Sequence, residues 1–567
     1  MRSYALTAWV ATTTALAINS STTLASLCTT DYIVSTLPSN LTGITIDSTS
    51  VTANAVYDAV STGQASFPDS VYDYCEVNFA YTNTKSLRVQ VVYWMPAPGS
   101  FKNRYQTQAG AGYATTLPNT RGAGVSYGAA TGGTDGGFGS FSTNFDAVAL
   151  NADGTINNDL YEMFAYQSAS ECTLVGKAFT SNFYAMGSTK LYTYYQGCSE
   201  GGRNAWSQAQ NYGAMYDGII IGAPALRYGQ QQVIHLYSNV VEHTLNYYPY
   251  PCEIQVIVNE TISNCDALDG KIDGVVSRTD LCLLNYNISA SLGKPFDCYF
   301  NNQGNVSAEG IAVAQKILDG VHKSDGTLAY ISYQPSAQFD DATTVYDWDT
   351  NTWGLSISQK AGEWIARFLE KQIGATNLPN LDNVTYDTMA DWMSQGMWEF
   401  PALQTNNPNL AAMRDSGGKI LVYHGEVDPS VPTGSSVHFH ESIRSLMYPG
   451  LSLDESNAEM APWLQLYLVP GAAHCAPSGA QANGPYPQTN MGVMIDWVEN
   501  GKVPTTLNAT HLGGDNKGAN QQLCQWPKRP LWTDGGETLT CVFDQESYET
   551  WVYDFNAYLP YLEDPLY

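Results

Sequence analysis

How this chain folds is decided by one stretch, Leu191-Tyr-Thr-Tyr-Tyr-Gln-Gly-Cys-Ser-Glu-Gly-Gly-Arg203. Its first six residues have the aromatic content of a strand, and a helix is expected from about Gly202. Between them lies Gly197-Cys-Ser-Glu-Gly201, which matches the pattern G-x-S-x-G. A strand that turns through glycines directly into a helix holds the central serine exposed at the edge of a sheet. The context therefore predicts Ser199 as a catalytic nucleophile.

The five-residue pattern alone is a weak signal, because Gly124-Val-Ser-Tyr-Gly128 matches it too. Ser126, however, has glycine-rich sequence on both sides, which predicts a loop rather than a strand and a helix. We therefore interpret Ser126 as a turn serine.

Working outward from Ser199, predicted strands alternate with predicted helices. This alternation favours a largely parallel sheet, and with a serine at a strand-to-helix turn it predicts an α/β-hydrolase fold. The expected strands are Leu87–Met95, Arg104–Gln108, Asp217–Gly222, Lys419–Val427 and Leu464–Pro470, and the expected helices are Asn158–Phe183, Ser435–Met447 and Met491–Asn500.

The alternation stops between about residues 228 and 411, where the chain is rich in tyrosine and asparagine and contains four cysteines. We interpret this segment as a lid domain inserted between two halves of one sheet. The expected organisation is a signal peptide (1–25), the first part of the core (26–227), the lid (228–411) and the second part of the core (412–567).

A serine hydroxyl needs a base to accept its proton, and in this fold the triad follows the chain order serine, acid, histidine. His474 comes after a predicted strand and a turn of small residues, which makes it the predicted base. His235 and His243 lie in the insertion, where they could contact substrate but not complete a triad on the sheet. His424, His438 and His440 precede the expected position of the base, so a core or surface role is expected for these three.

The acid is expected at the end of the strand in Lys419-Ile-Leu-Val-Tyr-His-Gly-Glu-Val-Asp428. A carboxylate at that sheet edge holds the imidazole in its reactive tautomer and stabilises the imidazolium. We predict Asp428, with Glu426 as the alternative two residues earlier.

Two further features surround the predicted triad. Cys198 immediately precedes the nucleophile and Cys475 immediately follows the base, so a disulfide between them would tie the two catalytic loops together. For the oxyanion we expect the N–H of Glu200, at the helix start, and a second donor from the glycine-rich loop at Gly110 and Ala111.

At these residues the sequence resembles the tannase and feruloyl esterase family, which is marked by cysteines beside the catalytic serine and histidine. The stretches that carry the resemblance are Tyr194–Arg203, Gly222–Arg227, His474–Cys475 and Cys524–Trp532. The resemblance implies a carboxylic ester hydrolase that cleaves galloyl ester and depside bonds of tannins and alkyl gallates through a galloyl-serine intermediate, releasing gallic acid. It also implies galloyl contacts at Gln231, Gln232, His235 and Ser430, although the glutamine run equally fits a polar helix start.

Two other functions stay open. A feruloyl or chlorogenate esterase acting on hydroxycinnamate esters would share the triad and differ mainly in its lid contacts. A non-catalytic secreted binding protein could use the same scaffold.

A short acidic loop in the insertion, Asp266-Ala-Leu-Asp-Gly-Lys-Ile-Asp-Gly-Val275, places three carboxylates among glycines. Oxygen-rich loops suit Ca²⁺, and the resemblance implies a structural calcium here; the alternative is an acidic surface turn. The expected ligands are the carboxylates of Asp266, Asp269 and Asp273 and the carbonyls of Lys271 and Val275.

The chain has eleven cysteines, so at least one stays unpaired within it. Cys265 and Cys282 bracket the acidic loop and are expected to pair. The resemblance implies Cys28–Cys75 and Cys524–Cys541, which leaves Cys252 and Cys298 by elimination. Cys172, inside a predicted helix, is expected to be the free thiol.

The composition of the chain limits the kinds of partner and the compartment that we expect. The 53 acidic residues against 25 basic ones give a net charge of −28, which argues against nucleic acid and anionic membranes. Arg2 and the uncharged stretch Tyr4–Ala17 are typical of a secretory signal. Charged residues make up only 14% of the chain, and N-linked glycans are expected at Asn40, Asn259, Asn287, Asn305, Asn383 and Asn508. The sequence predicts a secreted esterase with no organic cofactor.

Overall fold

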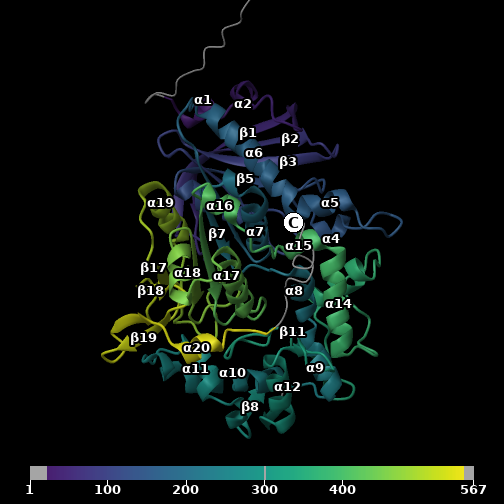
Figure 1. The fold of residues 1–567 in the computed structure, drawn as a ribbon. Coiled ribbons are helices and arrows are strands. Elements are labelled where there is room, and N and C mark those ends of the chain that lie inside the picture. Colours follow the sequence, from purple (N-terminus) through teal and green to yellow (C-terminus); the bar gives the residue numbers. More distant parts are fainter. Residues whose placement is uncertain (1–21, 299–301, 555–567) are drawn as a thin grey trace, which may run out of the picture.

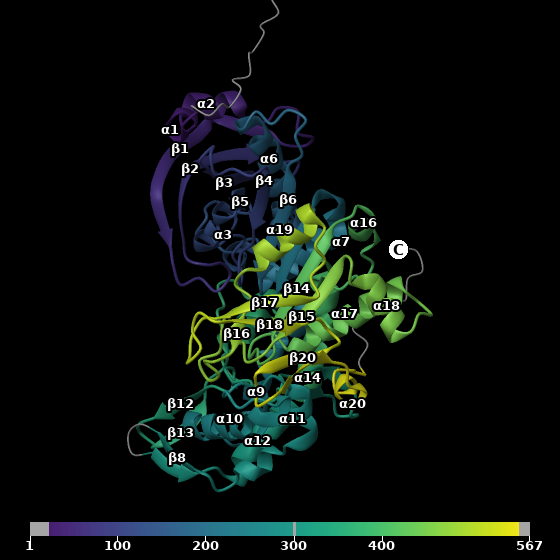
Figure 2. The same ribbon diagram turned by 90° about the vertical axis from the view of Figure 1, so that its left-hand side faces the viewer.

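The computed structural model describes residues 22–298 and 302–554. Residues 1–21 of the predicted signal peptide (1–25) lie outside the described residues. Its expected end at residue 25 falls within the short helix α1 (Leu24–Leu27). The core is one nine-stranded sheet with the strand order β1-β2-β3-β5-β4-β6-β7-β14-β15. Figures 1 and 2 show the fold from two sides. In chain order, these strands are β1 (Thr45–Ser61), β2 (Ser70–Thr82), β3 (Arg88–Pro96), β4 (Arg104–Gln108), β5 (Ala129–Thr134), β6 (Tyr192–Cys198), β7 (Gly218–Gly222), β14 (Lys419–Gly425) and β15 (Leu464–Val469).

The sheet has an antiparallel part and a parallel part. β1, β2, β3 and β5 pair antiparallel, whereas β5, β4, β6, β7, β14 and β15 run parallel. The carboxyl ends of the parallel strands therefore meet at one edge, which is where ligand sites form in sheets of this kind.

Helices cover both faces of the parallel part. Ile219 and Ile221 of β7 pack in one core with α7 (Glu200–Tyr212) and α17 (Thr433–Met447), while Ile220 packs in another with α19 (Asn490–Asn500). Successive side chains of a strand point to opposite faces, so a strand as apolar as β7 is buried on both sides.

The antiparallel part is covered by a further helix, α6 (Ser168–Phe183). The expected helix Asn158–Phe183 is formed by α5 (Asn158–Glu162), one π-helical turn and α6. Phe179 of α6 packs its ring against Phe79 of β2 and Tyr93 of β3.

The chain leaves the sheet after β7 and re-enters it at β14, which is the direct neighbour of β7; Gly218 pairs with Lys419. The longer helices of the segment between them are α8 (Tyr228–Ile234), α9 (Tyr237–Leu245), α10 (Pro251–Cys265), α11 (Thr279–Asn285), α12 (Ala308–Leu318) and α14 (Tyr386–Glu399). Much of this segment lies at the bottom and right of Figure 1, where α8 to α12 and α14 are labelled. Three short hairpins join them, β8 (Pro295–Cys298) with β9 (Asn302–Asn305), β10 (Val321–His322) with β11 (Leu328–Tyr330), and β12 (Thr344–Asp347) with β13 (Thr352–Leu355).

The glycine-rich region before residue 140 is more ordered than the sequence indicated. It contains α3 (Gly122–Ser126) and the central strand β5, where only loop was expected. After β15 the chain adds smaller strands, β16 (Pro485–Tyr486), β17 (Thr506–His511), β18 (Asn520–Cys524), β19 (Arg529–Thr533) and β20 (Thr538–Val542).

Candidate active site

Ser199 lies between β6 and α7, at the turn that its sequence context predicts. Its backbone has φ 64° and ψ −126°, a conformation that non-glycine residues rarely adopt and that exposes the hydroxyl in a nucleophile elbow. The turn needs glycine at Gly197, because a Cβ there would come within 2.3 Å of the carbonyl oxygen of Gly201. A hydrogen bond stabilises this backbone conformation, since the N–H of Ser199 donates to the carbonyl of Gly222 at 3.0 Å.

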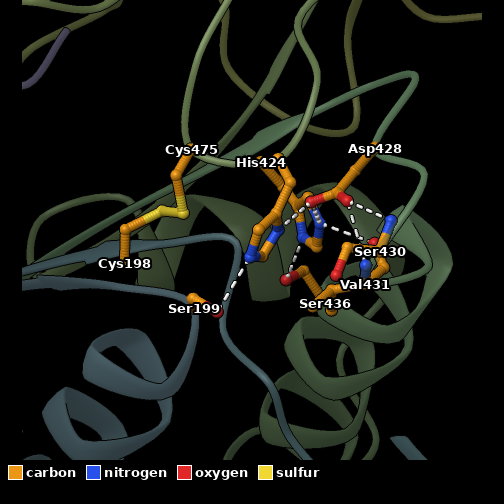
Figure 3. The surroundings of a disulfide bond; sticks show 9 residues. Cys198, Ser199, His424, Asp428, Ser430, Val431, Ser436 and Cys475 are labelled. Carbon is orange, nitrogen blue, oxygen red and sulfur yellow. Dashed lines mark hydrogen bonds and ion pairs between the residues drawn. A yellow bond between two sulfur atoms is a disulfide. The ribbon is translucent and has the colours of Figure 1, made fainter. Parts of the chain in front are cut away.

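The three predicted triad residues meet at the carboxyl edge of the parallel strands (Figure 3). The hydroxyl of Ser199 lies 2.8 Å from Nε2 of His474, and Nδ1 of His474 lies 2.7 Å from Oδ2 of Asp428. The serine hydroxyl can thus donate to Nε2 while Nδ1–H donates to the carboxylate, the arrangement in which the imidazole can accept the serine proton.

Asp428, not Glu426, is the carboxylate in contact with His474. Glu426 instead accepts hydrogen bonds from Arg529 and Thr279 in a buried cluster. Asp428 is fully buried; burial raises the pKa of its carboxyl, but the charge of His474 and the hydrogen bonds from His424 and His474 outweigh that effect and hold the pKa well below its usual range. A lowered pKa favours the ionised carboxylate, which is the form that can accept Nδ1–H of His474.

Ser126 is not part of this arrangement. It ends α3, and its hydroxyl donates to the carbonyl of Ala123 at 2.9 Å. Its environment is helical rather than the expected loop, but the interpretation of Ser126 as a serine with a local structural role agrees with this contact.

The predicted disulfide between Cys198 and Cys475 is confirmed, with Cα atoms 6.0 Å apart. Figure 3 shows it close to Ser199. The other four predicted pairs are confirmed as well, and Cys172 is a buried free thiol, as expected; the four pairs are Cys28–Cys75, Cys252–Cys298, Cys265–Cys282 and Cys524–Cys541.

A cavity of about 390 Å³ opens beside Ser199, and Gly110, Ala111, His474 and Cys475 line it with the serine. The N–H groups of Gly110 and Ala111 make no hydrogen bond within residues 22–298 and 302–554, so they are available to an oxygen in the cavity. A Cβ on residue 110 would come within 1.8 Å of the carbonyl oxygen of Ala114, which explains the glycine. Glu200 supplies the first N–H of α7, next to the serine.

The four predicted galloyl contacts lie at the junction of α8 with the loop that carries the acid. The amide of Gln231 donates to the carbonyl of Ser430 at 2.9 Å, and the N–H of Ser430 donates to Asp428 at 2.8 Å. Gln231 and His235 are buried, whereas Gln232 is half-buried. The lining of the cavity beside Ser199 includes none of the four.

The sequence did not predict two partners of these residues. Nδ1 of His235 contacts Oδ2 of Asp341 at 2.5 Å, and a second histidine, His424, contacts Asp428, the predicted acid. Asp341 is 106 positions from His235, so no local pattern reveals it. His424 lies in β14, four positions before Asp428 in the turn that follows the strand, and this short spacing is the signal that could have found it.

The acidic loop holds its carboxylates close to its own backbone. Asp266 accepts the N–H groups of Asp273 and Gly274, Asp269 accepts that of Lys271, and the amine of Lys271 lies 2.9 Å from Asp273. Among the described residues, no group of three or more His, Cys, Asp or Glu side chains is arranged to hold a metal ion. The carbonyls of Lys271 and Val275 would have to complete any calcium site at this loop.

Within the described ranges, no helix combines the length and the apolar character that crossing a membrane requires.

Comparison with known proteins assigns the fold and the chemistry to a family. The chain is 45% identical to a tannase of Aspergillus oryzae over 94% of its own length and 95% of that protein, and 30% identical to a probable feruloyl esterase of Arthroderma benhamiae over 84% and 86% of the two chains. Its structure superposes on a tannin acyl hydrolase of Aspergillus niger with a TM-score of 0.92 and 51% identity, covering 94% of this chain and 98% of that one. The α/β-hydrolase fold expected from the sequence is confirmed. The model of tannase and feruloyl esterase matches residues 75–547, and this chain, with its serine–histidine–carboxylate site at the sheet edge, belongs to that family of carboxylic ester hydrolases.

Proposed function

We propose that this protein is a tannase that hydrolyses galloyl esters, with Ser199, His474 and Asp428 as its catalytic triad. The observation that carries the proposal is the imidazole of His474, which contacts the serine hydroxyl with one nitrogen and a buried carboxylate with the other. A relative that shares 45% identity over 94% of this chain is named a tannase, which favours a galloyl ester over other esters.

The reaction that this geometry supports has two stages. His474 accepts the proton of Ser199 as Oγ bonds to the ester carbonyl carbon, and the N–H groups of Glu200 and of Gly110 or Ala111 stabilise the oxyanion. The C–O bond to the alcohol then breaks, and His474 returns the proton to the leaving alcohol. Water, deprotonated by the same imidazole, attacks the galloyl-serine and releases gallate.

The galloyl group would be recognised by the polar groups at the junction of α8 and the acid loop. Gln231, Gln232, His235 and Ser430 offer amide, imidazole and hydroxyl groups to three adjacent phenolic hydroxyls. A buried site that bonds hydroxyl groups rejects analogues that lack them. Depside bonds, which join one galloyl group to another, present the same acyl group to this junction.

A hydroxycinnamate esterase is the second candidate, favoured by the 30% identity to a probable feruloyl esterase. A substrate panel separates the two. We expect a higher kcat/KM on methyl gallate than on methyl ferulate or methyl chlorogenate; the reverse order would replace the galloyl assignment. Labelling of Ser199 by an active-site phosphonate excludes a non-catalytic binding protein.

We further propose that the protein is secreted and glycosylated. Five disulfides are typical of an oxidising compartment. Asn40, Asn259, Asn287, Asn305 and Asn383 are exposed and Asn508 is half-buried, so the acceptor side chains are accessible. Mass spectrometry of the secreted chain after glycosidase treatment tests both points.

Calcium at the acidic loop is likewise a proposal. Asp266 and Asp269 are buried, and no lysine, arginine or histidine in the described ranges forms an ion pair with either. Burial and the nearby charges of Asp273 and Asp266 raise the pKa of Asp269 to about 6, so a cation would relieve a local excess of negative charge. Any such ion would be structural, and no step of the reaction passes through it.

A further inference from the structure

The side chain of His424 contacts the catalytic carboxylate from within the sheet. His424 belongs to β14 and is fully buried. Its Nε2 lies 3.1 Å from Oδ2 of Asp428 and 3.0 Å from the carbonyl oxygen of Val431, and its Nδ1 lies 2.8 Å from Oγ of Ser436 on α17. Figure 3 shows the ring between these three partners.

These partners determine where the ring carries its proton. A backbone carbonyl can only accept a hydrogen bond, and so can an ionised carboxylate. Nε2 faces one of each and must therefore be the N–H. Nδ1 faces a serine hydroxyl, which can donate, so a neutral ring satisfies every partner. The contacts hold His424 in the Nε2–H tautomer.

With this donor, all acceptor positions of the Asp428 carboxylate are used. Oδ1 accepts the N–H groups of Ser430 and Val431 at 2.8 and 2.9 Å. Oδ2 accepts Nδ1–H of His474 and Nε2–H of His424. A carboxylate has about four such positions, so the group can neither rotate nor tilt without breaking a hydrogen bond in a buried site. His424 provides the only one of the four that comes from a side chain other than the catalytic base.

We propose that His424 is a positioning residue of the triad, whose Nε2–H holds Oδ2 of Asp428 where it accepts Nδ1–H of His474. This inference rests on the proposed function, because it presupposes that His474 is the base. Without that donor, Oδ2 keeps one side-chain partner and the carboxylate can turn about its remaining hydrogen bonds. The imidazole of His474 would then lose its fixed direction toward Ser199, which lowers the rate of the chemical step more than it weakens substrate binding.

Two substitutions of His424 by amide residues distinguish a role in positioning Asp428 from a role in packing. In His424→Gln the amide nitrogen can take the place of Nε2 and still donate to Asp428, whereas in His424→Asn the shorter side chain reaches only the place of Nδ1, next to Ser436. Both variants lose the aromatic ring. The measurement is kcat and KM on methyl gallate, per site titrated with an active-site phosphonate.

We expect His424→Gln to keep kcat within about threefold, and His424→Asn to lose about 10- to 100-fold in kcat with KM within about twofold. Equal kcat values in the two variants, or a loss that falls on KM, would overturn the proposal. If the Asn variant yields no titratable sites, His424→Met fills the volume without a donor and is expected to show the same loss. In an Asp428→Asn background the Gln and Asn variants should differ no further, because the N–H groups of Ser430 and Val431 retain the amide oxygen and an NH2 group replaces the oxygen that faced position 424.

Failure of this inference is distinguishable from failure of the proposed function. A native protein that does not turn over methyl gallate, or a Ser199→Ala variant that keeps the native rate, refutes the function itself. A native rate that is lost in Ser199→Ala, together with equal Gln and Asn variants at position 424, refutes only the role of His424.

Discussion

Cys198 is bonded to Cys475 across 277 positions of the chain, and the residues next to these two cysteines are Ser199 and His474, the proposed nucleophile and base. One covalent link therefore restrains the two loops whose separation sets the distance between Oγ and Nε2.

We expect breaking this link to lower the rate as well as the stability. In Cys198→Ala/Cys475→Ala, kcat per titrated site should fall roughly 10- to 100-fold, because small displacements of the reacting groups are costly; the chain-entropy model adds a stability loss of roughly 5 kcal/mol. The matched control is Cys524→Ala/Cys541→Ala, which opens a loop of 17 residues and should lose stability with little change in kcat. Similar kcat values for the two double variants would contradict the catalytic role of the link.

Removing the nucleophile tests the assignment of the serine. Ser199→Ala should reduce hydrolysis of methyl gallate about 10⁴-fold or more, leaving only what binding and the oxyanion donors contribute. Ser126→Ala is the control, since its hydroxyl only caps the carbonyl of Ala123 and its loss should leave kcat unchanged. Comparable activity in both variants would remove Ser199 from the mechanism.

The two carboxylates at the end of β14 should respond differently. Asp428→Asn leaves the imidazole without an anionic partner and should lower kcat about 10⁴-fold. Glu426→Gln removes a charge that contacts Arg529 and Thr279, so it should lower the free energy of unfolding while kcat per titrated site stays within a few-fold. Urea unfolding and steady-state rates of the two variants test this assignment. A larger loss of kcat in Glu426→Gln than in Asp428→Asn would reverse the two roles.

The buried carboxyl of Glu242 in α9 should make the free energy of unfolding depend on pH. It is fully buried, its Oε1 has no partner among the described residues, and burial raises its pKa to about 8. A carboxyl whose pKa is higher in the folded than in the unfolded chain stabilises the fold. This stabilisation is complete only below the unfolded pKa, which is about 4.5. That contribution is lost as the pH rises toward 8 and amounts to roughly 4 kcal/mol over the window.

Glu242→Gln keeps the neutral shape and should remove this loss. The unfolding free energy of the variant, measured relative to the native protein in urea, should therefore rise between pH 4.5 and 8. Glu309→Gln, at the exposed start of α12, is the control and should show no such rise. A constant difference across the window would mean that Glu242 is ionised in the fold.

Calcium binding at the acidic loop has a readout that does not involve catalysis. Chelation should lower the Tm of the native protein, and added Ca²⁺ should restore it, because a ligand that binds only the folded state stabilises it. Asp269→Asn should abolish the calcium response, whereas Asp325→Asn, in an exposed turn, should keep it. An unchanged Tm after chelation of the native protein would leave the loop as an acidic turn.

The sequence was most informative where local backbone geometry and chemistry coincide. The glycines around Ser199 mark a turn that few other residues can form, and the two cysteines beside the serine and the histidine linked positions that are otherwise remote. β5 was missed because its sequence, Ala-Ala-Thr-Gly-Gly-Thr, resembles a loop. A glycine is needed in this strand because of a tertiary contact: a Cβ on Gly132 would come within 2.3 Å of the hydroxyl of Tyr105.

The contact between His235 and Asp341 could not be read from the sequence for a different reason. The two residues are 106 positions apart, and they meet only because the end of α8 packs against a later loop of the insertion. Interpreting His424 as a core residue was correct for its burial and incomplete for its contact with Asp428.

The insertion between β7 and β14 starts and ends on neighbouring strands, which pair directly at Gly218 and Lys419. Because the two strand ends already lie side by side, an insertion of a different length can connect them within the same sheet. Enzymes built on this plan are free to diversify in the molecules they accept while the machinery that cuts them stays the same.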